Sequence, residues 1–220
     1  GHAESPPCRK SPELHSLSAV EGSRYFDDVL AFGGKGFAWK RKGGEGRRRR
    51  RKRRKEKKKV EFFADAWLFS LKHRRWTEVE FRRREERPKS RWKPSSTALA
   101  GGQGMILFGG CHGTKVKGVL NDLWVLRLSS GRGVWERIGT RNPPAARRGH
   151  IAVANDTHLV VAGGKGHTHR RGAMVHRDLW LLPLEALKSG RGGEWVRGTA
   201  FPGAPRWGAT GSLLRLPGGH

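Results

Sequence analysis

Histidine is the residue type with the clearest chemical potential in this sequence, and it gathers in one segment. His167, His169 and His176 stand close together, and His112 follows an earlier glycine pair in the same way. A His-x-His pair with a third histidine can bind zinc or copper. No acidic or cysteine ligand completes the set, and histidines in loops are more often solvated than bound to metal. We therefore expect no metal site and no cofactor.

Other catalytic patterns are also missing from the sequence. It holds no Ser/His/Asp arrangement, no phosphate-binding loop and no paired carboxylates with a reason to meet, so it predicts no enzyme. Its two cysteines, Cys8 and Cys111, lie far apart, which favours a reducing compartment over a disulfide framework. No apolar run has the length of a membrane span, and no signal peptide is recognisable. We expect an intracellular protein, cytoplasmic or nuclear, with no membrane partner.

Four short segments recur in one order along the chain. An apolar run that ends in a glycine pair occurs as VLAFGG (29–34), MILFGG (105–110) and LVVAGG (159–164). An Asp-x-Trp element, a second tryptophan and an arginine follow each run, and the Asp-x-Trp elements are 57 and 56 residues apart. The recurring positions are Gly33, Gly34, Asp65, Trp67, Trp76, Arg91, Gly109, Gly110, Asp122, Trp124, Trp135, Arg147, Gly149, His150, Gly163, Gly164, Asp178, Trp180, Trp195 and Arg206.

Each recurring segment is typical of a β-strand. The glycine-pair runs are short, continuous and apolar, as expected of strands buried on both faces, whereas WTEVEF (76–81) and WERIG (135–139) alternate like an outer strand. A helical interpretation fails because the runs are too short and glycine closes each of them. The sequence therefore predicts an all-β fold of four-stranded antiparallel units.

These segments resemble the kelch repeat of β-propeller proteins. The positions from Arg148 to His150, the pair Gly163-Gly164, the aspartate Asp178 with its tryptophan, and Trp195 follow the family pattern most fully. The resemblance implies an N-terminal tail (1–11), three blades (12–81, 88–139 and 144–198) and the start of a fourth (205–220). A propeller usually needs four to eight blades, so we expect an incomplete one, taken from a longer or truncated parent.

The resemblance also assigns structural roles to the recurring residues. The glycine pairs are expected to adopt positive φ and to let neighbouring blades approach closely. The tryptophans should pack between blades, and the aspartates should accept backbone hydrogen bonds at the third-strand turn. In blade one the first strand, placed around 14–20, has no arginine of its own.

One segment of blade one is strongly basic. Residues 40–59 hold fifteen Lys or Arg and two Glu in a chain whose formal net charge is +27. Charges of one sign at this density predict a disordered insertion. It is either a solvated segment with no selected role, a nuclear-import signal or a contact for RNA or DNA phosphates. Its basic residues are Lys40, Arg41, Lys42, Arg47, Arg48, Arg49, Arg50, Arg51, Lys52, Arg53, Arg54, Lys55, Lys57, Lys58 and Lys59.

The kelch resemblance favours a binding scaffold over a catalyst. Copper-radical oxidases related to this family need tyrosine ligands, and Tyr25 is the single tyrosine of the chain. The iron-binding Glu-x-x-x-Asp-x-x-x-His pattern of specifier proteins begins at Glu61 and Asp65 but ends at Phe69. We expect a scaffold or adaptor that binds protein partners through its loop-bearing face. The alternative is a polyanion-binding or nuclear protein that acts through the polybasic insertion.

Overall fold

In the computed structural model, the regular secondary structure of the described residues is almost entirely β-strand. The described residues are 9–10, 13–17, 28–38, 59–82, 85–99, 103–113, 118–168, 172–188 and 192–214. Within them a single four-residue helix, α1 (Glu185–Lys188), interrupts the succession of strands. The predicted disorder of the basic insertion concerns residues that lie outside these ranges, except for Lys59.

Three four-stranded antiparallel sheets form the body of the molecule, and we call them blades one, two and three. In each, the strands pair in the order in which they occur along the chain. Blade one contains β2 (Glu13–Leu17), β3 (Asp28–Phe32), β6 (Ala66–Ser70) and β7 (Arg75–Glu78). Blade two contains β8 (Ser95–Ala98), β9 (Gly104–Cys111), β10 (Val119–Ser129) and β11 (Arg132–Ile138). Blade three contains β13 (Ile151–Ala154), β14 (His158–Ala162), β17 (Leu179–Pro183) and β19 (Val196–Arg197).

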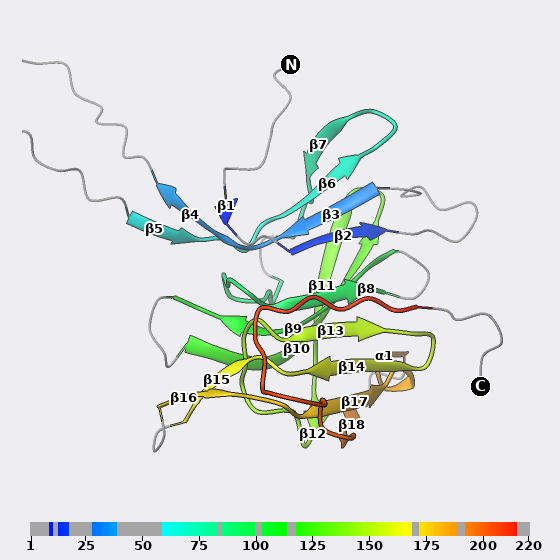
Figure 1. Cartoon of the computed structure of the whole chain (residues 1–220). Coiled ribbons are helices and arrows are strands. Elements are labelled where there is room, and N and C mark those ends of the chain that lie inside the picture. The colour runs from blue at the N-terminus through cyan, green and yellow to red at the C-terminus, as the bar shows by residue number, and fades with distance from the viewer. Residues whose placement is uncertain are drawn as a thin grey trace, which may run out of the picture.

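The blades stack face to face, with blade two between the other two (Figure 1). Successive side chains of a strand point to opposite faces of its sheet, so β9 serves two cores. Met105 and Leu107 join the core shared with blade one, whereas Ile106 and Phe108 join the core shared with blade three. Every residue of β9 is buried as a result. Its continuous apolar run therefore follows from burial on both faces.

Small hairpins extend one edge of each blade beyond its glycine pair. In blade one, β4 (Lys35–Ala38) pairs with β5 (Lys59–Phe62) and with β1 (Arg9–Lys10). In blade two, β9 and β10 continue past the glycines until Cys111 pairs with Val119. In blade three, β15 (Lys165–Thr168) pairs with β16 (Gly172–Val175). All three project from the same side of the stack (Figure 1), which we call the hairpin side.

The last described segment, where the start of a fourth blade was expected, does not form a strand. Residues 198–214 hold no strand and run as an extended trace along β13 (Figure 1). Gly208 N–H donates to the Gly149 carbonyl at 2.7 Å. The described residues contain no further glycine-pair strand with which this segment could form a ladder. The last short strands, β12 (Thr140–Arg141) and β18 (Gly193–Glu194), form a parallel pair between blades two and three.

The fold class predicted from the sequence is confirmed. The described elements are nearly all strands, the larger sheets are four-stranded and antiparallel, and within the described residues they close no ring. No helix in this part of the chain is long and apolar enough to cross a membrane.

Candidate functional site

A buried arginine ties each of two blades to the blade before it. The Arg147 guanidinium is fully buried and forms two hydrogen bonds with the Asp178 carboxylate, Nη1 to Oδ1 at 2.7 Å and Nη2 to Oδ2 at 2.9 Å. Its Nη1 also donates to the Gly163 carbonyl at 2.9 Å. Trp180 Nε1 donates to the same carboxylate at 2.7 Å. The planar guanidinium matches the carboxylate in the bidentate geometry that gives the strongest ion pairs.

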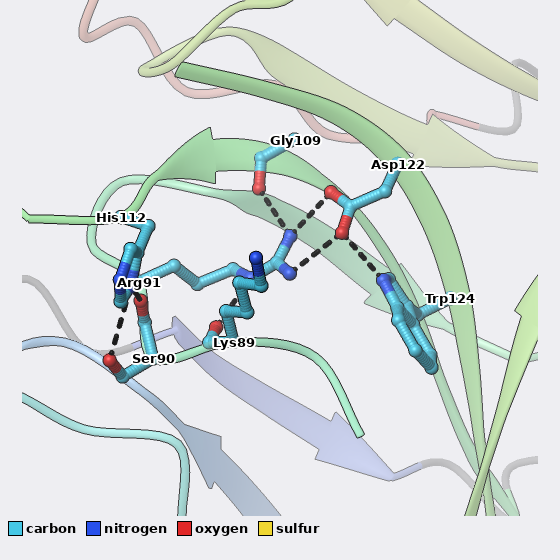
Figure 2. A network of polar contacts seen from close by, with 7 residues as sticks. All are labelled: Lys89, Ser90, Arg91, Gly109, His112, Asp122 and Trp124. Carbon is cyan, nitrogen blue, oxygen red and sulfur yellow. Dashed lines mark hydrogen bonds and ion pairs between the residues drawn. The ribbon is translucent and has the colours of Figure 1, made fainter. Parts of the chain in front are cut away.

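Blade two repeats this arrangement with different residues (Figure 2). Arg91 donates to both oxygens of Asp122, at 2.7 and 2.8 Å, and to the Gly109 carbonyl at 2.8 Å. Trp124 Nε1 donates to Asp122 Oδ2 at 2.7 Å. The aspartates therefore accept mainly from arginine and tryptophan side chains, whereas the sequence suggested backbone donors at a turn.

The backbone of each arginine binds the preceding blade. Gly34 of blade one donates to the Arg91 carbonyl at 3.0 Å, and Gly110 of blade two donates to the Arg147 carbonyl at 2.9 Å. Gly164 of blade three donates in the same way to the Arg206 carbonyl at 2.8 Å. The Arg206 side chain is exposed and lies 5.1 Å from the Phe201 ring. Arg206 thus has the backbone contact of the motif but is not buried like the other two arginines.

The arginines hold both aspartates in the charged state. Burial alone would raise the pKa of Asp178, but hydrogen bonds from Arg147 and Trp180 and the charge of Arg147 lower it to about 2. Burial acts in the same direction on Asp122, and the hydrogen bond and charge of Arg91 again outweigh it, so the pKa of Asp122 is lowered. The two networks are therefore fixed ion pairs near neutral pH and do not behave as exchangeable acids.

Blade one has an arginine at the corresponding backbone position, contrary to the expectation from its sequence. In blade two Cys111, the residue after the glycine pair, forms a β-bridge with Trp92, and in blade three Lys165 forms one with Arg148. Trp92 and Arg148 each directly follow a buried arginine. In blade one the residue after the glycine pair is Lys35, and it pairs with Lys10, which places Arg9 at the arginine position. The sequence does contain a signal for this arginine: the pattern Pro-x-x-Arg begins at residues 6, 88 and 144 and ends on Arg9, Arg91 and Arg147. The prediction missed it because the arginine was sought within the first strand, around 14–20, whereas in each blade it lies four residues before that strand begins. Within this blade, Trp67 Nε1 donates to Asp65 Oδ2 at 2.8 Å.

The glycine pairs have the backbone conformation that was expected. In all three pairs the first glycine has φ between 62° and 66° and the second between 94° and 98°. A Cβ on Gly164 would lie 2.7 Å from the His150 Cβ, so the pair also permits a close approach between first and second strands. His150 is itself buried, and desolvation together with the charge of Arg147 lowers its pKa to about 3. This histidine is therefore neutral in the folded protein near neutral pH.

The second tryptophan of each repeat packs against the preceding blade where one is described. Trp135 of blade two lies edge-on to Phe32 of blade one, with ring centroids 5.0 Å apart. Trp195 of blade three lies 5.3 Å from Phe108 of blade two. Trp76 of blade one instead contacts Phe69 of its own blade, at 5.1 Å, and is half-buried.

The histidines do not form a metal-ligand set in the described part of the chain. His167 is exposed on β15, His176 is buried, and His112 bonds the Ser90 carbonyl at 2.7 Å. No three His, Cys, Asp or Glu side chains among the described residues converge as metal ligands would. His169 lies outside the described residues, as do residues 40–58 of the polybasic insertion.

A group of cations and indoles at the base of the hairpins was not predicted. Three cationic groups surround the Trp92 ring: Lys35 Nζ at 4.1 Å, Arg148 Cζ at 5.1 Å and Lys93 Nζ at 5.6 Å from its centroid. We call the whole group the cation–indole cluster; it comprises Lys35, Trp92, Lys93, Arg148, Lys165 and Trp207. Five of its six members directly follow a glycine pair or a motif arginine, a shared offset that could have revealed it.

The second half of the cluster surrounds Trp207, which is 47% exposed. Lys93 Nζ lies 4.6 Å and Lys165 Nζ 5.0 Å from its ring centroid. Lys93 therefore contacts both indoles and makes the cluster continuous. Its position at the base of the hairpin side adds positive charge to the surface from which the hairpins project.

Comparison with known proteins agrees with this architecture. Residues 43–208, most of the chain, match the family model described as the KLHDC2/KLHL20/DRC7 Kelch-repeats domain. The chain belongs to the Kelch-repeat family. Kelch-repeat domains bind protein partners and are in general interaction domains and not enzymes.

Several plant proteins resemble this Kelch-repeat chain in part. Adagio-like protein 3 of Oryza sativa subsp. japonica is 35% identical over 102 residues, 46% of this chain and 15% of that protein. Adagio protein 3 of Arabidopsis thaliana is 33% identical over 78 residues, 35% of this chain and 12% of that protein. The chain thus matches less than a sixth of the length of these relatives.

Proposed function

We propose that this Kelch-repeat chain is a scaffold or adaptor that binds a protein partner through its hairpin side. The observation that carries the proposal is the common direction of the three hairpins, which follow the glycine pairs of successive blades (Figure 1). Loops on a rigid frame can vary in sequence without disturbing the core, which suits them to recognition. The buried Arg–Asp pairs and the inter-blade tryptophans supply that frame.

The test exchanges the tips of the hairpins and compares them with turns at the other end of the same blades. Residues 40–58, 113–117 and 169–171 are replaced together by Gly-Ser segments of equal length. The matched control replaces 71–74, 130–131 and 155–157, which strand register places at the opposite ends of the sheets. Proteins captured by the unaltered chain are then quantified for both variants by mass spectrometry.

The expected result is loss of the same captured proteins from the hairpin variant and their retention by the control. If the hairpin variant retains them, the partner does not bind through the hairpin side and the proposal is wrong. Equal unfolding temperatures for the three chains show that the frame has survived the exchanges.

The polybasic insertion supports a second proposal, that the chain binds a polyanion or an import receptor. Fifteen Lys or Arg within twenty residues would attract nucleic-acid phosphates and would make binding strongly salt-dependent. A salt titration with single-stranded RNA tests this in the full chain and after deletion of residues 40–59. RNA binding that survives the deletion would show that the insertion does not carry it. Nuclear accumulation that requires the insertion would support the import receptor as partner.

A further inference from the structure

We infer that the cation–indole cluster is the binding site for an acidic peptide segment, one that presents at least two carboxylates. This inference rests on the proposed function, because it names the chemistry of a partner for the hairpin side. It begins from the cluster's composition, in which four cationic side chains surround two indole rings.

The backbone fixes these side chains close to one another. Arg148 and Lys165 exchange two backbone hydrogen bonds, at 3.0 and 2.9 Å. Gly149 N–H donates to the Lys93 carbonyl at 2.9 Å, and Gly208 then donates to the Gly149 carbonyl. The first strands of blades two and three and the last described segment are therefore joined where the cluster lies. The charges cannot separate by a shift of one loop.

Lys35, Arg148 and Lys165 of the cluster carry positive charge that the described residues do not neutralise. No ion pair joins Lys35, Arg148 or Lys165 to a carboxylate in the described part of the chain. All three side chains are partly buried, so solvent screens their mutual repulsion less than it would at a fully exposed site. Their attraction to the indole rings offsets only part of that repulsion. An anionic ligand would remove the rest of the repulsion among these three cations.

The arrangement favours carboxylates over nucleic-acid bases. Single-stranded nucleic acid gains most from bases stacked on open aromatic faces. Here cations lie against both indoles, three around Trp92 and two around Trp207, so a base would have to displace them. A carboxylate instead can accept charge-assisted hydrogen bonds from lysine and arginine where they stand. Because the cations are shared between two rings, one carboxylate cannot contact them all, and an extended segment with several is required.

The experiment measures binding of defined probes to the full chain by fluorescence anisotropy. The probes are fluorescein-labelled hexaglutamate, hexaglutamine of the same length, and a six-nucleotide uridine RNA. One variant carries Lys35→Gln, Arg148→Gln and Lys165→Gln. The matched control removes three exposed cations at the opposite end of blade one, two in the turn and one at the start of β7, through Lys72→Gln, Arg74→Gln and Arg75→Gln. A third variant, with Lys35→Arg, Arg148→Lys and Lys165→Arg, keeps the charge.

We expect the cluster variant to bind hexaglutamate about tenfold more weakly, with less than a twofold change in the control and in the charge-keeping variant. Hexaglutamate should also protect the amines of Lys35 and Lys165 from acetylation, as read by mass spectrometry, in the unaltered chain. This second readout separates the cluster from the polybasic insertion, whose lysines are different. Hexaglutamine should neither bind nor protect.

Three outcomes would overturn the inference. The first is equal weakening in the cluster and control variants, and the second is protection confined to the lysines between 40 and 59. The third is tighter binding of the uridine RNA than of hexaglutamate, lost in the cluster variant, which would make the ligand a nucleic acid. If the hairpin exchange abolishes partner capture while the cluster variant does not, the proposed function stands and this inference fails.

Discussion

Arg91 and Arg147 each bind two blades, one through the backbone and the other through the side chain. The backbone carbonyl accepts a hydrogen bond from the preceding blade, while the guanidinium binds the aspartate of its own blade. Buried ion pairs gain little over apolar packing, but removal of one partner leaves an uncompensated charge. These arginines therefore matter most for the uniqueness of the blade-to-blade arrangement.

Arg147→Ala should lower the free energy of unfolding by about 3–5 kcal/mol, because it leaves the Asp178 carboxylate without its buried partner. Urea denaturation followed by tryptophan fluorescence measures the change. Arg206→Ala is the matched control, since this arginine has the same place in the motif but an exposed side chain, and we expect a change within about 0.5 kcal/mol. Equal effects of the two substitutions would contradict the structural role of the Arg–Asp pair.

His150 should make stability depend on pH. Its pKa is lowered to about 3 in the folded chain from the ordinary value near 6.5, chiefly by desolvation, so between these values the unfolded chain binds more protons. The free energy of unfolding should then fall as the pH falls below about 6.5, by up to about 1.4 kcal/mol per pH unit from this residue. His150→Phe should reduce the slope measured by urea denaturation between pH 7 and pH 4.5. An unchanged slope would show that another group is responsible.

At the scale of single elements, the turn from the second strand into the hairpin is the most constrained. In blades two and three the second glycine of the pair combines positive φ with close contact to the residue just before the first strand of its own blade. Gly110 has φ of 97°, and a Cβ there would lie 2.9 Å from the Pro94 backbone nitrogen. Backbone atoms cannot yield as a flexible side chain can, so the position requires glycine for two independent reasons.

Gly110→Ala should destabilise the protein by about 3 kcal/mol or more, from backbone strain together with the clash against Pro94. Gly172→Ala is the matched control: Gly172 also has positive φ, at 68°, but a Cβ there meets no atom within 4 Å. It should cost about 1 kcal/mol from strain alone. Thermal unfolding of both variants separates the two contributions, and equal losses would exclude the clash.

The strands were predictable from the sequence because their signals are local. Apolar runs closed by glycine pairs and outer strands with alternating polarity placed β3, β9, β14 and β11 correctly. The Arg–Asp pairs were not recognised, since they join residues in different strands, although both pairs have the same separation of 31 residues. The cation–indole cluster joins five segments in space, and its one sequence signal, the shared offset from the glycine pairs and motif arginines, was not used in the prediction. The start of a fourth blade, expected at 205–220, forms no strand in its described part, 205–214, because a strand needs a neighbour as well as a suitable sequence.

At the scale of the whole molecule, stability passes from blade to blade through shared apolar cores. Blade two contributes one face to each of the two apolar cores, so unfolding of blade two would expose both cores to solvent. Neighbour-only contacts of this kind make a repeat array behave like a line of coupled units. The tryptophans that cross between blades are the largest side chains in that coupling.

Trp135→Ala should destabilise the chain by about 3–5 kcal/mol, because its ring fills the space between Phe32 and Trp124. Trp76→Ala, at the same position of blade one, should cost clearly less, since Trp76 is half-buried and contacts its own blade. Hydrogen exchange should show faster exchange of β3 and β6 amides in the Trp135 variant, because blade one loses its support. Unchanged exchange in these strands would mean that the blades are not coupled through this ring.

The pairing of β4 with β5 has a consequence for how the chain can change length. Ala38 and Lys59 are paired residues, so the twenty residues between them leave and return at one point. The entropy lost on closing such a loop grows only with the logarithm of its length, by about 0.6 kcal/mol for each doubling. This junction can therefore accept an insertion of almost any size, and a reporter domain inserted there should leave the unfolding temperature of the blades nearly unchanged.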